Sequence, residues 1–112
     1  MMWKEARLRA IAAVRALGLP RRMDGVPCRL ANYADAATLR ALKPEEPTLT
    51  LQGQRMINQA FARELRKRGA VVTLMTVTEP AFRAWLAAEN LPNNPATRAQ
   101  YISTLPPSAE RQ

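Results

Sequence analysis

The residues best suited to bind a partner are basic, and four of them lie within one predicted helix, residues 51–68. At 100° per residue, this basic group falls largely opposite the apolar side of the helix. Guanidinium and ammonium groups on one exposed face could contact several phosphates of a nucleic acid together. Three further arginines in the irregular segment 19–34 could lie close to that face. The seven candidate contacts are Arg55, Arg63, Arg66, Lys67, Arg21, Arg22 and Arg29.

Other chemistries find little support in the sequence. The chain contains no histidine, the residue that most often serves as a general base or a metal ligand. Its single cysteine, Cys28, has no activating base in the pattern around it, so a buried structural thiol is expected. Glu45 and Glu46 are adjacent in a proline-rich segment, where consecutive side chains point apart, and glycine-rich phosphate-binding motifs are absent. The sequence therefore predicts no enzymatic activity, no metal and no cofactor.

Length and charge limit the possible classes of protein. At 112 residues the chain is expected to form one domain, residues 1–105, followed by a flexible tail, residues 106–112. The formal net charge of +8 favours a polyanionic partner, although an arginine-rich composition also follows from GC-rich codon usage. One cysteine excludes an intramolecular disulfide, and no run of about 18 apolar residues could span a membrane. A cytoplasmic location without membrane attachment is expected.

The basic helix is followed by the clearest strand signal in the chain, residues 71–77. Thr50 is a suitable N-cap for the helix, and Gly69 suits the position after its C-terminus, where a positive φ is common. β-Branched and long apolar residues then alternate with threonines, as is typical of a strand. Val72 and Leu74 face one way, and the remaining apolar residues face the other way. Because both faces are apolar, we expect this strand to be covered or paired.

The sequence leaves the partner of this strand open. One candidate is the segment 26–30, whose residues alternate in polarity and which contains Pro27, a residue typical of edge strands. The short run 48–51 is a second candidate, and the same strand in another copy of the chain is a third. The residues of a homodimer interface through this strand would be Val72, Leu74 and Met75.

Further helices are predicted on both sides of this central unit. Apolar residues recur at helical spacing over residues 3–17, 36–43, 79–90 and 95–104. Proline, glycine and asparagine separate these segments from one another. The predicted fold class is helix-rich α+β, in the order ααα-β-αα, with a small sheet built around strand 70–78.

The C-terminal part of the chain resembles a ribbon-helix-helix unit in its layout. Strand 71–77 is followed by helix 79–90, an Asn-Pro break and helix 95–104, about a third of the chain. The resemblance implies a dimer formed through the strand, with the paired strands in the DNA major groove. The strand departs from that pattern, since neither of its faces carries the polar residues that read DNA bases.

Two hypotheses about function follow from these patterns. The first is a small, basic, non-enzymatic protein that binds nucleic acid or a nucleoprotein through the arginine-rich helix face. The alternative is a protein–protein interaction or accessory module, an inhibitor or adaptor of the kind that mobile elements carry. Such a module could form a homodimer through strand 71–77, because that strand is apolar on both faces.

Overall fold

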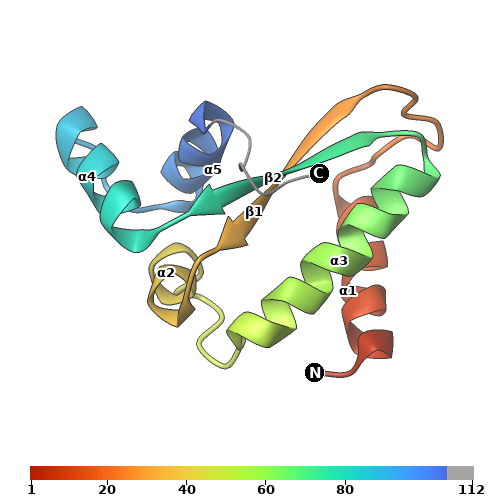
Figure 1. The fold of residues 1–112 in the computed structure, drawn as a ribbon, viewed down its shortest axis with the longest axis horizontal. Helices are drawn as coiled ribbons and strands as arrows, with labels where there is room; N and C mark the ends of the chain where they lie inside the picture. Colours follow the sequence, from red (N-terminus) through yellow and green to blue (C-terminus); the bar gives the residue numbers. More distant parts are fainter. Residues whose placement is uncertain (106–112) are drawn as a thin grey trace.

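The computed structural model describes residues 1–105 and has a helix-rich α+β fold, as the sequence predicts (Figure 1). Within these residues, five helices surround a sheet of two parallel strands. In chain order the elements are α1 (Trp3–Ala16), β1 (Pro27–Tyr33), α2 (Ala36–Leu42), α3 (Leu51–Lys67), β2 (Val71–Val77), α4 (Glu79–Glu89) and α5 (Pro95–Thr104). None of these helices is long and apolar enough to cross a membrane. The predicted tail, residues 106–112, lies outside the described residues.

The predicted strand finds its partner within the chain. β1 and β2 pair in parallel, from Pro27 opposite Val71 to Tyr33 opposite Val77. Parallel strands need a long crossover connection, and here α2 and α3 supply it. The predicted order ααα-β-αα therefore lacks one strand. β1 is missing from that order because its sequence pattern made segment 26–30 only one of three candidate partners, and pairing with the distant β2 decides its conformation.

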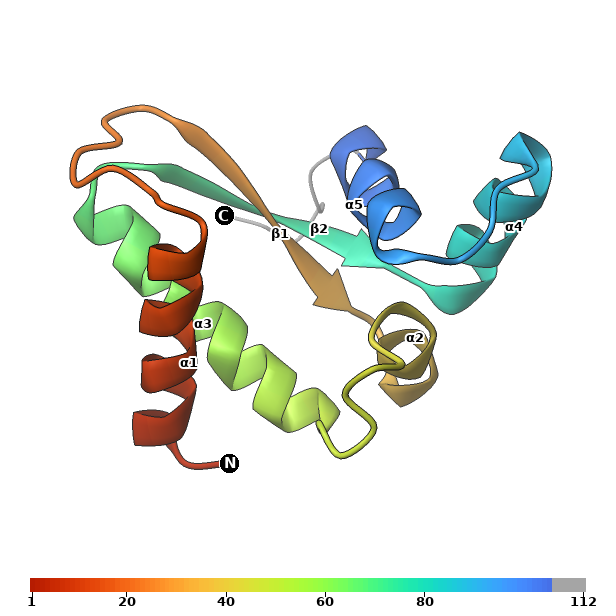
Figure 2. The same ribbon diagram turned by 180° about the vertical axis from the view of Figure 1, so that it is seen from behind.

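α3 connects the two strands and lies across one face of the sheet, with α1 packed against it (Figures 1 and 2). The Thr50 Oγ1 caps its first turn by accepting a hydrogen bond from the Gly53 N–H at 3.0 Å. Gly69 follows its C-terminus with a φ of 94°, a conformation open to a residue without a side chain. Ala6 and Ala10 of α1 are fully buried, and such small side chains let two helices approach closely.

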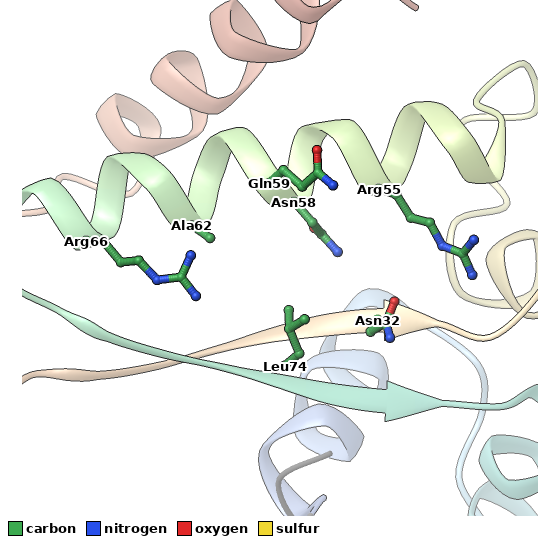
Figure 3. A pocket seen from close by; sticks show the side chains of 7 residues that line it. All are labelled: Asn32, Arg55, Asn58, Gln59, Ala62, Arg66 and Leu74. Atoms are coloured by element: carbon green, nitrogen blue, oxygen red, sulfur yellow. The ribbon is translucent and has the colours of Figure 1, made fainter. Parts of the chain in front are cut away.

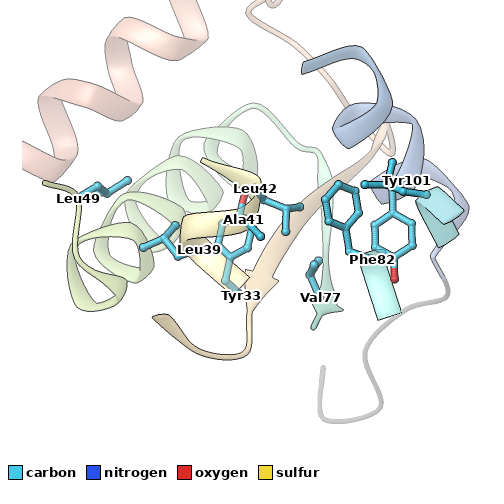
Figure 4. Packing of buried hydrophobic residues seen from close by; sticks show 9 residues of the cluster. Tyr33, Leu39, Ala41, Leu42, Leu49, Val77, Phe82 and Tyr101 are labelled. Atoms are coloured by element: carbon cyan, nitrogen blue, oxygen red, sulfur yellow. The ribbon is translucent and has the colours of Figure 1, made fainter. Parts of the chain in front are cut away.

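An apolar cluster lies on each face of the sheet. One cluster contains Tyr33, Phe82 and Tyr101 and is formed mainly with α2, α4 and α5, while Leu51 and Ile57 of α3 pack against its margin (Figure 4). The rings of Phe82 and Tyr101 have centroids 5.2 Å apart and are tilted against each other. The cluster on the α3 face includes Leu30 of β1 and Leu65 of α3. Because side chains alternate along a strand, each strand contributes to both clusters.

Candidate binding groove beside the sheet

One side of α3 faces a cavity of about 220 Å³ between the helix and the sheet (Figure 3). It is lined by Asn32 of β1, Leu74 of β2, and Arg55, Asn58, Gln59, Ala62 and Arg66 of α3. Residues 55, 59, 62 and 66 repeat at spacings of four, three and four, which places them along one stripe of a helix. Arg55 and Arg66 stand at its two ends, about 16 Å apart along the helix axis. We call this cavity the arginine groove.

The arginine groove is basic and has no compensating acid. No carboxylate is found among the described residues that line it. The guanidinium of Arg66 has no hydrogen-bond or ion-pair partner within residues 1–105. The Nη2 of Arg55 reaches the Tyr33 carbonyl oxygen, but at the long distance of 3.4 Å. Two exposed guanidinium groups with free donors are suited to bind a carboxylate or a phosphate.

Side-chain amides connect the groove to β1. The Asn58 Nδ2 donates to the Ala31 carbonyl oxygen at 2.6 Å, and the Gln54 Nε2 donates to the Asn58 Oδ1 at 3.0 Å. A carbonyl oxygen can only accept, so Ala31 fixes the orientation of both amides. Gln54 is buried, and its Oε1 is left as an acceptor without a partner in the described part of the chain. The two amides hold α3 in a fixed position over β1.

The outer edge of β2 runs beside the arginine groove. The Val71 N–H donates to the Val26 carbonyl and the Ala34 N–H donates to the Val77 carbonyl, both at 2.9 Å. The odd-numbered residues of β2 therefore turn their backbone groups toward β1. Since successive residues turn to opposite edges, Val72 and Leu74 direct their N–H and C=O groups away from β1. Within residues 1–105, no backbone group pairs with these outward groups.

The structure brings only part of the predicted basic set together. Arg55 and Arg66 line the groove, and Arg63 is exposed on the neighbouring flank of α3, where its side chain has no partner in residues 1–105. The Nζ of Lys67 lies 3.3 Å from a carboxylate oxygen of Glu64, so its charge is partly compensated.

The three arginines outside α3 contribute less to a common surface. Arg21 and Arg22 are exposed in the loop before β1, and Arg22 forms an ion pair with Asp24 at 3.2 Å. That loop is held near the end of α3 by the backbone, since the Met23 N–H donates to the Arg68 carbonyl at 2.6 Å. The expectation that Arg29 lies near the basic helix face is wrong. Its Nη1 donates to carbonyl oxygens at the end of α5, on the opposite face of the sheet.

The predicted interface residues on β2 also differ in their surroundings. Val72 and Leu74 are half-buried on the α3 face, and Leu74 forms part of the groove. Met75 is fully buried, so its side chain does not reach the surface. The groove amides were not among the predicted site residues. The repeat of positions 55, 59, 62 and 66 in the sequence could have indicated one wall of the groove. The opposite wall depends on β1, which the sequence offered only as one of three candidate partners of strand 71–77.

The described residues offer no metal centre, since no three Cys, Asp or Glu side chains gather as ligands in them. Cys28 is a free, half-buried thiol that packs beside the cluster on the α3 face. The absence of enzymatic activity stays a prediction. No known protein family, curated protein or solved structure matches this chain.

Proposed function

We propose that the protein is a non-enzymatic interaction module that binds an extended segment of a partner protein along the outer edge of β2. The observation that carries this proposal is the set of outward N–H and C=O groups at Val72 and Leu74, which lack backbone partners within residues 1–105. An exposed strand edge is a template for a further strand, and many recognition domains bind peptides in this way. Main-chain hydrogen bonds supply affinity, and the neighbouring arginine groove supplies side-chain selectivity. Homodimerisation through the same strand stays a prediction, and so does the cytoplasmic location.

Selection from an unbiased peptide display library tests this function. Peptides enriched on the wild-type protein should bind poorly to Val72→Pro, which removes an outward N–H that the sheet itself does not use. Val72→Ala is the matched control, because it shortens the same side chain and keeps the N–H. We expect the alanine variant to retain binding and the proline variant, checked for native circular dichroism, to lose it. Equal binding to all three proteins would show that the β2 edge is not the site.

Nucleic-acid binding by α3 is a second candidate function. The observation in its favour is that Arg63 and Arg66 are exposed and lack acidic partners within residues 1–105. An arginine on a helix face can contact the phosphate backbone without reading the base sequence. The second function uses the helix face alone and needs no free strand edge.

Titration of labelled single- and double-stranded oligonucleotides over a salt series tests the second function. Micromolar binding at about 0.15 M salt, with affinity that falls steeply as salt rises, is the expected result. The double variant Arg63→Glu/Arg66→Glu should abolish it. A double variant on α1, Lys4→Glu/Arg7→Glu, makes the same change of charge at exposed positions elsewhere. If both double variants lose affinity equally, the binding reflects net charge and not the α3 face.

A further inference from the structure

We infer that the strand added to β2 carries two acidic side chains, four residues apart, on the side that faces α3. This inference rests on the proposed strand addition and concerns the chemistry of the added segment. The arginine groove and the open edge are neighbours, because Leu74 belongs to both. A segment paired with Val72 and Leu74 would therefore direct every second side chain toward the groove.

The spacing of the two arginines sets the spacing of the acids. Arg55 and Arg66 are about 16 Å apart along α3, with Gln59 and Ala62 between them. Residues i and i+4 of a strand lie on one face and are about 13 Å apart. Long, flexible arginine side chains can make up the remaining difference. Residue i+2 would lie opposite Gln59 and Ala62, where a small or hydrogen-bonding side chain fits. The pattern reads the same in both chain directions, so it holds for parallel and antiparallel addition.

Charge complementarity selects an acidic peptide over a second copy of the chain. The strand sequence Val-Val-Thr-Leu-Met-Thr-Val has no acidic residue to offer Arg55 or Arg66. Pairing of two β2 edges about a twofold axis would also bring two arginine stripes onto the same side of one sheet, where like charges repel. A second copy would therefore pair the backbone groups of the β2 edge but would bring no negative charge to the arginine groove.

The open edge likewise selects a polypeptide over a nucleic acid. Val72 and Leu74 each present one donor and one acceptor in alternation. A phosphate backbone can accept hydrogen bonds from N–H groups, but it has no donors for the carbonyl oxygens. An extended peptide matches both kinds of group along the strand.

Amide exchange measured by NMR, combined with peptide titration, tests the inference. The probe is a soluble peptide of about nine residues, rich in threonine and valine, with glutamate at its third and seventh positions. Its matched control has glutamine at both positions. We expect the glutamate peptide to bind at least about tenfold more tightly and to slow exchange of the Val72 and Leu74 amides. The Arg66→Glu variant should lose this preference, whereas Arg63→Glu, the same change outside the groove, should keep it.

Five outcomes would overturn the inference, and they separate it from the proposed function. Equal binding of both peptides with slowed exchange at Val72 and Leu74 leaves strand addition standing and removes the acidic pattern. Binding without slowed exchange, or no binding by either peptide, removes strand addition as well. If exchange of the two amides slows in the peptide-free protein as the protein concentration rises, the edge is assigned to a second copy of the chain. Displacement of the peptide by an oligonucleotide would assign this face to nucleic acid if Arg63→Glu and Arg66→Glu lower the affinity for the oligonucleotide equally.

Discussion

The two outer edges of the same small sheet are built differently. At β1, Pro27 has no N–H to offer, and the Asn58 side chain occupies the Ala31 carbonyl. The charged Arg29 lies on the strand itself. These features are the ones that natural sheets use to block pairing with other chains.

At Val72 and Leu74 of β2, the described residues supply none of these protections. Its sequence contains no proline and no charge, and no described side chain occupies the outward backbone groups of Val72 and Leu74. Val71, at the start of the strand, is 56% exposed. This contrast between the two edges is the reason for proposing that a partner adds a strand beside Val72 and Leu74.

Proline substitution tests the contrast most severely. Thr73→Pro should destabilise the fold by about 3 kcal/mol, because the Thr73 N–H faces β1 and its hydrogen bond is lost. Val72→Pro should cost less than about 1 kcal/mol, because the Val72 N–H faces outward. Urea unfolding followed by circular dichroism measures both values. Similar costs at the two positions would mean that the β2 edge is not open.

The second prediction concerns Tyr33 of the protected strand, whose ring is locked in the core. The pKa of Tyr33 is raised to about 12, mainly by burial and also by the nearby Glu46 carboxylate, while Arg98 acts in the opposite direction. The unfolded chain releases this proton near pH 10, so the contribution of Tyr33 is complete below pH 10 and is lost as the pH rises toward 12. The loss amounts to at most about 2–3 kcal/mol.

Unfolding by urea at several alkaline pH values checks this titration. In Tyr33→Phe the decline of stability between pH 10 and 12 should be clearly shallower than in the wild type, since no phenol titrates at this position. An unchanged decline would assign the alkaline transition to other groups.

Patterns among neighbouring residues predict most of the helices and the strand β2. The features that the sequence left open depend on pairing between segments that are far apart in the chain. The cap at Thr50, the stop at Gly69 and the periodicity between them define α3 from neighbouring residues alone. β1 depends on contacts with a strand more than forty residues away. The role of Arg29 depends on the same missing strand, because only the paired sheet turns this side chain toward α5. A charged residue therefore could be identified from the sequence, but its partner could not.

The third prediction concerns a variant that weakens the protection of the β1 edge. Asn58→Ala should destabilise the protein by about 1–2 kcal/mol, because it leaves the Ala31 carbonyl and the buried Gln54 amide without partners. Gln59→Ala removes an exposed amide at the next position and should change the free energy of unfolding by less than about 0.5 kcal/mol. Thermal and chemical unfolding measure both. If the two alanine variants are equally stable, Asn58 does not secure α3 to β1.

The smallest expected change in stability comes from placing a charged side chain on β2, a strand without charged residues. Val71→Lys should change the free energy of unfolding by less than about 0.5 kcal/mol, because Val71 is largely exposed and lysine is tolerated on strand edges. The same substitution at Ala31 of β1 should cost about 1–3 kcal/mol, because Ala31 packs against the apolar cluster beneath α2, α4 and α5. Chemical unfolding of the two lysine variants measures this difference directly. A loss above about 1 kcal/mol at Val71 would mean that its side chain packs in the free protein, and the two edges would then differ less than their sequences indicate.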